Sequence, residues 1–200
     1  METQMSDGST TENGADVLSD VVAEAPTAPS KTARRVLPFL IKRQGTWLYQ
    51  GSPIKRKEMV CMFASMLRRD KEGHFWLKTP REEGVIQVED APFTAVELNF
   101  EGSCGRHQTL SLRTNIDEII SVNAMHPLMT QWRQIVTPDA APVPYVQVRA
   151  GDGDFPILAR LTRAVYFELA ALAVPGQVGC EKCMGVWSDN CFFPLAPHLD

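Results

Sequence analysis

The sequence predicts an α+β protein with mostly antiparallel sheets, two main helices and two lobes. Three observations support this prediction. Short segments that alternate apolar and polar residues recur along the chain, as in half-buried strands. Two segments carry apolar residues at helical spacing. A similar order of motifs also occurs twice.

This near-repeat covers residues 46–77 and 145–188. Each copy reads as a strand, a Gly turn, a Pro-Ile helix start, a helix and a Trp-bearing strand. We therefore expect two lobes built from a duplicated strand–helix–strand unit, with a ligand-binding groove between them.

The first 30 residues carry six carboxylates and no Lys or Arg, and they are rich in small and polar residues. Such a segment buries too little apolar surface to offset its ordering entropy. We expect a disordered acidic leader over residues 1–35, an N-terminal lobe over 36–91 and a C-terminal lobe over 92–200. The mixed basic and apolar residues 31–43 are expected to be a linker that packs onto the first lobe.

Composition argues against several classes of protein. The remainder of the chain holds 20 basic and 18 acidic residues, so it lacks the basic footprint of non-specific nucleic-acid binding. No apolar run is long enough to span a membrane. Five cysteines without a signal peptide indicate a reducing compartment, and the predicted location is the cytoplasm.

The first helix is expected to begin at Ser52-Pro53 and to reach Arg69, because Ser caps helices and Pro suits the first helical position. Its expected buried stripe is Met59, Val60, Phe63 and Leu67. The second helix is expected to be capped by Asp154 and to end before Pro175-Gly176. Its expected stripe is Ile157, Leu161, Val165, Leu169 and Leu172.

The remaining alternating segments predict strands. They cover residues 74–79, 85–89, 93–100, 107–113, 119–122, 130–136 and 145–149. Residues 186–187 and 191–193 are separated by Ser-Asp-Asn and should close the chain as a hairpin.

Several motifs resemble a known family. They are Trp47, Pro53-Ile-x-Arg56, Trp76-Leu-x-Thr-Pro-x-Glu82, Val88-Glu-Asp-Ala-Pro-Phe93, Leu112-x-Thr-Asn-x-Asp117, His126-Pro127, Pro144-Tyr145 through Arg149, and the closing Gly-Val-Trp-Ser and Phe-Phe-Pro. Over residues 45–196 the chain resembles the bacterial family called domain of unknown function 1285. The resemblance implies a duplicated core and a C-terminal part superficially like pleckstrin-homology folds. It also implies no assigned enzyme activity, a suspected ligand site between the lobes and a role in signal transduction.

The candidate binding residues lie in these motifs and beside the Pro-Ile segments. They are Arg56, Thr79, Glu89, Asp90, Asn115, His126, Tyr145, Arg149 and Arg160. The arginines could form internal salt bridges, or they could line a groove that holds phosphate or carboxylate. The neighbouring carboxylates of Glu89 and Asp90 should point to opposite strand faces, and Asn115 is also a common turn former.

These features favour a non-enzymatic binding module without a cofactor, whose partner is a protein or a small anionic ligand. One alternative is a small hydrolase or transferase that uses His126 with Glu89 or Asp117. A second alternative is nucleic-acid binding through the basic helix ends.

The cysteines offer a further alternative at the end of the chain. Cys180, Cys183, Cys191 and His198 have the residue types, and the first pair has the spacing, of a zinc site. We expect no metal, and we interpret these thiols as incidental loop residues.

Overall fold

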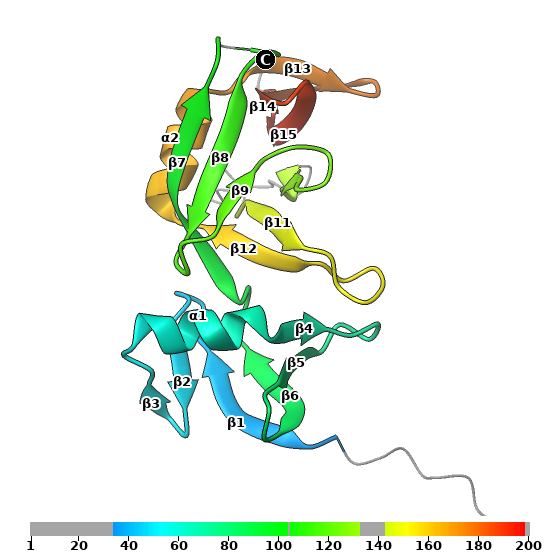
Figure 1. The fold of residues 1–200 in the computed structure, drawn as a ribbon. Helices are drawn as coiled ribbons and strands as arrows, with labels where there is room; N and C mark the ends of the chain where they lie inside the picture. Colours follow the sequence, from blue (N-terminus) through cyan, green and yellow to red (C-terminus); the bar gives the residue numbers. More distant parts are fainter. Residues whose placement is uncertain (1–33, 104, 133–142, 199–200) are drawn as a thin grey trace, which may run out of the picture. The chain divides into compact units, whose positions relative to one another are not determined.

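The computed structural model of the chain describes residues 34–103, 105–132 and 143–198 (Figure 1). The predicted leader therefore falls outside the described residues, apart from its last two. The elements in chain order are β1 (Val36–Ile41), β2 (Trp47–Tyr49), β3 (Ser52–Pro53), α1 (Lys57–Ser65), β4 (Leu67–Arg69), β5 (Phe75–Lys78), β6 (Glu83–Val88), β7 (Phe93–Glu101), β8 (Thr109–Thr114), β9 (Ile119–Ser121), β10 (Leu128–Met129), β11 (Tyr145–Arg149), β12 (Ile157–Leu161), α2 (Arg163–Ala171), β13 (Val174–Val178), β14 (Glu181–Ser188) and β15 (Cys191–Pro197).

Two six-stranded sheets share one topology. The first, which we call the N-terminal sheet, has the order β3-β2-β1-β6-β5-β4, and the C-terminal sheet has the order β10-β11-β12-β7-β8-β9. In each sheet two antiparallel three-stranded meanders meet at one parallel pair, β1 with β6 or β7 with β12. The core is therefore duplicated, and β1–β6 correspond in order to β7–β12.

The structural repeat differs from the near-repeat in the sequence. The first Pro-Ile segment lies at the end of β3, and the second leads into β12, so neither begins a helix. Helix α1 follows the third strand of its sheet, whereas α2 follows the sixth strand of the C-terminal sheet. The predicted strand–helix–strand unit is therefore wrong. A Pro that suits the first turn of a helix is equally acceptable at a strand end.

Both helices are shorter than expected. Helix α1 begins after Arg56, which makes no side-chain capping bond, and it ends at Ser65. Of the stripe predicted for it, Leu67 belongs to β4 and Met59 is exposed. Phe63 is only half-buried and packs edge-on against Phe39, with ring centroids 5.1 Å apart. One side of α1 is thus incompletely covered.

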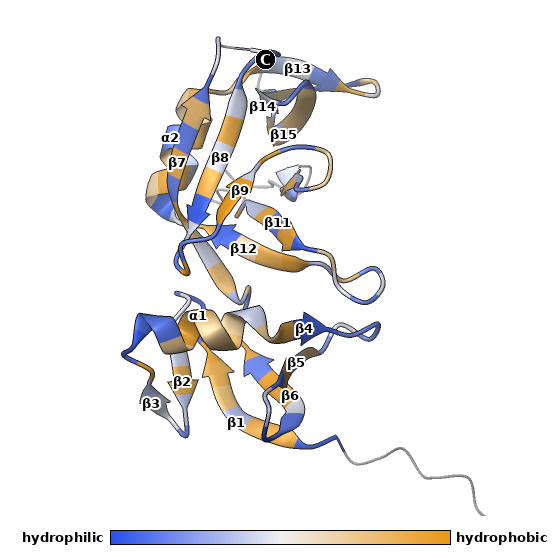
Figure 2. Ribbon diagram, in the orientation of Figure 1, coloured by the Kyte–Doolittle hydropathy of each residue, from blue (hydrophilic) through white to orange (hydrophobic). Residues whose placement is uncertain are grey.

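Strand β1 replaces the linker expected over residues 31–43. It pairs with β2 on one side and with β6 on the other, and it contributes buried Leu37, Phe39 and Ile41. Pro38 lies within this strand, at a shift in the register with β6. The shift accommodates a residue that has no N–H to donate. Figure 2 shows the apolar character of β1 and the polar N-terminal end of α1.

Helix α2 packs against β7 and β14 and buries Val165 and Leu169, as predicted. Its cap is Thr162, whose side chain accepts a hydrogen bond from the Val165 N–H, and not Asp154. The predicted residues Ile157 and Leu161 are buried, but they belong to β12.

A third sheet, β13-β14-β15, closes the chain. The predicted hairpin is present: Asp189 and Asn190 have φ of 48° and 61°, and Ser188 pairs with Cys191. The Pro175-Gly176 pair, expected to follow the second helix, lies inside the edge strand β13, where a missing N–H is tolerated. The buried Ser188 hydroxyl donates to the Val122 carbonyl at 2.6 Å and joins this sheet to the C-terminal sheet.

The fold is dominated by sheet, so the α+β prediction holds only coarsely. The predicted strand over residues 130–136 is replaced by β10, and its last four residues lie outside those described. Each helix in the described part of the chain has nine residues, and neither is long enough to cross a membrane.

Candidate functional site

Three predicted site residues form one cluster, which joins the connection between the two sheets to the strands β11 and β12. The Tyr145 hydroxyl donates to Asp90 Oδ1 at 2.8 Å, and Arg160 Nε lies 3.5 Å from Asp90 Oδ2. Tyr145 and Arg160 are paired across β11 and β12, which places both opposite Asp90. Arg43 Nε approaches the same carboxylate at 3.9 Å.

The electrostatics of this cluster keep Tyr145 a hydrogen-bond donor. Burial of the side chain and, after it, the hydrogen bond to Asp90 together raise the pKa of Tyr145 to about 12. The hydroxyl is therefore protonated at neutral pH. In the structure it donates to the Asp90 carboxylate.

A cavity of about 370 Å³ lies beside this cluster. Its wall combines residues of both sheets and of the segment that connects them. The lining residues are Arg69, Phe75, Asp90, Ala91, Pro92, Met129, Thr130, Gln131, Val143, Tyr145 and Leu158. The volume lies in the range of small-ligand sites, and we call this space the junction cavity.

Arg69 lines the junction cavity and is not among the predicted site residues. Its Nε donates to the Gly73 carbonyl at 3.1 Å and its Nη1 to the Pro156 carbonyl at 2.7 Å. The guanidinium also lies over Phe75 and Phe155, at 4.7 and 5.3 Å from the ring centroids. Burial lowers the pKa of Arg69, and the neighbouring Asp70 partly opposes that shift. The sequence predicts Arg69 at the end of the first helix, and no local sequence pattern indicates the short strand β4.

Arg149 and Asn115 hold the fold together instead of lining the junction cavity. Arg149 Nη2 donates to the Ala64 carbonyl at 3.1 Å, at the C-terminal end of α1, and lies 3.8 Å from Glu118. The Asn115 side chain accepts from the Thr94 N–H and donates to the Gly45 carbonyl. Arg149 therefore joins β11 to helix α1, and Asn115 joins the segment after β8 to the turn between β1 and β2.

Arg56 lies away from Arg149. Arg56 precedes the N-terminal end of α1, where it lines a groove that Thr79 also lines. Arg149 contacts the other end of the helix. The two arginines were expected to line one groove, and in the structure they do not. The two arginines were expected to converge because each lies near a Pro-Ile segment. These segments do not occupy equivalent positions in the fold, so Arg56 and Arg149 lie near opposite ends of α1.

The side chains proposed for the alternative hydrolase or transferase each contact a different partner. His126 Nδ1 lies 3.0 Å from the Gln147 carbonyl oxygen. Glu89 accepts from the Arg43 N–H and pairs with Lys42, and the hydrogen bond from Arg43 is the main reason that its pKa is lowered. Asp117 Oδ2 lies 2.6 Å from Lys57 Nζ. His126 is therefore paired with neither Glu89 nor Asp117 in the structure.

The four residues of the alternative zinc site are also not brought together. Cys180 is exposed at the β13–β14 turn, whereas Cys183 is buried within β14. Within the described ranges, the group of potential ligand atoms that does converge is Asp70, Glu72 and His74. Hydrogen bonding within the β4–β5 turn explains that convergence.

Asp70 organises this turn. Its Oδ1 accepts from the N–H groups of Glu72 and His74, and its Oδ2 accepts from Trp76 Nε1 at 2.7 Å. Burial acts to raise the pKa of Asp70, but these hydrogen bonds, led by that of Trp76, lower it to about 2. The turn leads directly out of the strand that carries Arg69.

We expect the Asp70 turn to lose its stabilisation between about pH 4 and pH 2. The folded-state pKa lies below the ordinary value of 3.8, so the unfolded chain binds more protons and acid favours unfolding. Urea unfolding at several pH values should show that Asp70→Asn lowers stability at pH 7 and that the difference from wild type shrinks toward pH 2. A difference that stays constant over this range would contradict the assignment.

Comparisons with known proteins agree with this architecture. Residues 29–91 match the family model "Domain of unknown function (DUF1285), N-terminal domain", and residues 92–195 match "Protein of unknown function (DUF1285), C-terminal domain". No curated protein matches the chain.

Two solved structures are similar to the chain. A DUF1285 family protein from Silicibacter pomeroyi is 34% identical, with 82% of this chain and 84% of that chain covered and a TM-score of 0.67. A second, from Shewanella baltica, is 23% identical, with 68% and 92% covered and a TM-score of 0.46. With both family models matched along one chain, this protein belongs to the DUF1285 family.

Proposed function

We propose that this protein is a non-enzymatic binding module and that the junction cavity holds a small anionic ligand. The observation that carries the proposal is the state of Arg69. Its guanidinium is half-buried, faces the cavity and forms no ion pair with another described residue. Its hydrogen-bond acceptors are two neutral carbonyls.

Neighbouring Asp70 acts on Arg69 only through its charge and forms no ion pair with it, so this partly desolvated cation can still accept an anionic partner. The Asp90 carboxylate also lines the cavity, but Arg160 and Arg43 lie beside it and offset its charge. Carboxylate and phosphate match the planar donor pattern of a guanidinium. The ligand class that fits is therefore a small carboxylate or phosphate.

Ligand binding without catalysis is the simpler interpretation of this cavity. Tyr145 is held protonated, and its hydroxyl is already bonded to Asp90. The candidate base His126 does not line the cavity. A protein that binds a ligand without converting it can report the presence of that ligand, which agrees with the signalling role implied by the family resemblance.

The test compares two neighbouring arginines on β4. Citrate, succinate and inorganic phosphate would be titrated against the full chain by calorimetry, with thermal unfolding as a second readout. At least one should bind wild type, and Arg69→Gln should weaken that binding by about tenfold or more, as expected for loss of a charge-assisted contact. Arg69→Lys should retain part of it.

Arg68→Gln is the matched control, since Arg68 is exposed on the same strand and does not line the junction cavity. It should bind the anion like wild type. Equal losses in the two variants, or anion binding that survives Arg69→Gln in a folded protein, would contradict the proposal.

A further inference from the structure

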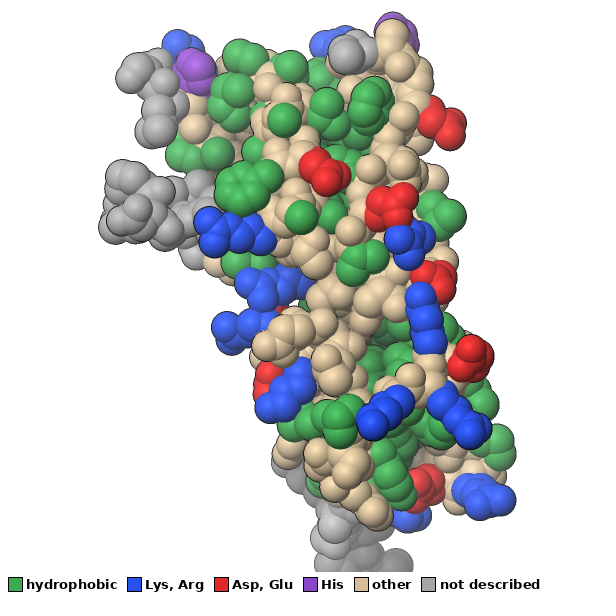
Figure 3. Space-filling view, turned by 90° about the vertical axis from the view of Figure 1, so that its left-hand side faces the viewer, with side chains coloured by type: hydrophobic (Ala, Val, Ile, Leu, Met, Phe, Trp, Pro, Cys, Tyr) green, Lys and Arg blue, Asp and Glu red, His purple; other side chains and the backbone are tan. Residues whose placement is uncertain are grey.

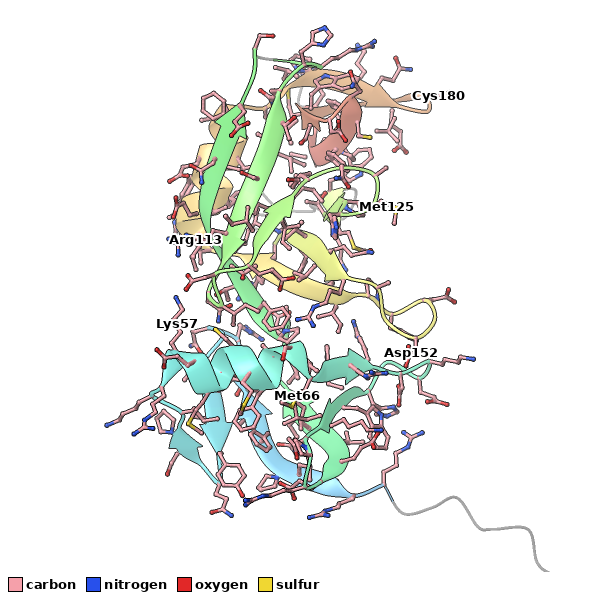
Figure 4. The ribbon with its side chains drawn as sticks, in the orientation of Figure 1. Lys57, Met66, Arg113, Met125, Asp152 and Cys180 are labelled. Atoms are coloured by element: carbon pink, nitrogen blue, oxygen red, sulfur yellow. The ribbon has the colours of Figure 1, made fainter. Side chains whose placement is uncertain are left out.

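A groove of about 740 Å³ in the N-terminal sheet is larger than the junction cavity and separate from it. Phe39 and Tyr49 form part of its wall on the sheet. Met59, Met62 and Phe63 line it from α1, as does Met66, the residue that caps this helix. Figure 3 shows hydrophobic side chains flanked by Lys and Arg over the lower part of the view, and Figure 4 labels Met66 and Lys57 at the ends of α1.

The apolar wall of the groove is open to solvent. Met59 is 40% exposed, Met62 46% and Tyr49 39%. Methionine side chains are unbranched and adapt to apolar ligands of different shape. A concave apolar surface of this kind is typical of a binding site.

The edge of the groove is positively charged. Lys55, Arg56 and Arg81 line it, and none of them forms an ion pair with another residue in the described part of the chain. Glu82 is the acidic lining residue, and it is bound to Arg35 at 2.7 Å. An occupant should therefore combine an apolar body with an anionic group.

The groove lies beside α1, which is about 13.5 Å long at ~1.5 Å per residue. Its volume of about 740 Å³ lies in the range of small-ligand sites and can hold one extended apolar chain beside the helix.

The polar groups of the groove distinguish an acyl chain from an extended peptide. The Thr79 hydroxyl is already bonded to the backbone of Glu82, and the Glu82 carboxylate is bonded to Arg35. The Met and Phe side chains of the wall offer no hydrogen-bond partners to peptide N–H and C=O groups that lie against them, and leaving such groups unpaired is costly. An acyl chain has no such groups.

We propose that this groove binds the acyl chain of an amphipathic anion, such as a long-chain fatty acid, with its head group at Arg56, Lys55 and Arg81. The site is independent of the junction cavity. The ligand class is defined by one extended apolar chain and one negative charge.

The probe is laurate, titrated against the full chain by calorimetry below its micelle-forming concentration. Dodecyltrimethylammonium, with an alkyl chain of nearly the same length and the opposite charge, should bind at least about tenfold more weakly because it faces the cationic edge. The double variant Arg56→Gln/Arg81→Gln should weaken laurate binding by about tenfold or more. Arg68→Gln, which alters a cation outside the groove, should not change it.

A second pair of variants tests the apolar wall. Met62→Glu places a charge in the groove and should weaken laurate binding by at least about tenfold, since burying a charge against an acyl chain is unfavourable. Met125→Glu, at a residue that is 75% exposed and does not line the groove, should bind laurate like wild type (Figure 4). Circular dichroism would verify that each variant is folded.

Sedimentation with lipid vesicles distinguishes binding of a free acyl anion from binding to a lipid surface. Laurate binding without co-sedimentation on vesicles of phosphatidylcholine and phosphatidylglycerol supports the proposal. Co-sedimentation without binding of monomeric laurate overturns it in favour of a membrane surface. Absence of laurate binding to wild type, or equal binding of the cationic analogue, also overturns it and leaves the Arg69 proposal untouched.

Discussion

Phe93→Ala is expected to lower the free energy of unfolding by about 3–5 kcal/mol. Phe93 is the first residue of β7, is fully buried and pairs with Ala159 in the parallel centre of the C-terminal sheet. The Arg149 guanidinium lies 5.4 Å from its ring centroid. Truncation would leave a cavity under a side chain that links the two sheets, and such a site cannot readily collapse.

The measurement is urea unfolding followed by circular dichroism, with the slope of each transition fitted as well as its midpoint. Phe100→Ala is the matched control in the same strand, because Phe100 is 54% exposed. It should cost less than about 1 kcal/mol. Similar losses for the two variants would show that the buried end of β7 has no special role in the core.

Asp90→Ala is expected to lower stability by about 2–4 kcal/mol, somewhat less than the loss of one partner in a fully buried ion pair. The change removes the acceptor of the Tyr145 hydroxyl and the counter-ion of Arg160. The Asp90 side chain is 20% exposed and that of Arg160 is 29% exposed, so water compensates only part of the loss.

A double-mutant cycle with Tyr145→Phe isolates the hydrogen bond between Tyr145 and Asp90. Tyr145→Phe alone should cost about 1–2 kcal/mol, and after Asp90→Ala its cost should fall by at least about 0.5 kcal/mol. Strictly additive effects would contradict the coupling. The same variants, titrated with the anion that binds wild type, report whether the cluster also shapes the junction cavity.

Strands with strong local patterns could be predicted from the sequence. In β8 the alternation from Thr109 to Thr114 gives buried Leu110 and Leu112, because one face of the strand packs on the core. The closing hairpin was also predictable, since Asp189 and Asn190 readily adopt positive φ. Family membership was equally visible, because the motifs are contiguous in the sequence.

Elements governed by competing local signals could not be predicted correctly. Ser52-Pro53 satisfies the rules for a helix start and also those for an edge strand, and the backbone hydrogen bonds to β2 decide for the strand. Leu67 continues the helical spacing of Phe63, yet it pairs with Leu77 in β4. Strands of two or three residues have too few positions to show a period of two.

The sequence by itself determined the class of the chain: its family, most of its longer strands, two helical regions and Asp90 and Tyr145 as candidate site residues. Only the tertiary structure decided which side chains meet. Asp90 reaches Tyr145 across 55 residues, and Arg69 reaches Pro156 across 87. Such contacts depend on the order of strands within the two sheets, which local patterns do not encode. The groove beside α1 exists for the same reason: the short helix leaves part of its apolar side uncovered.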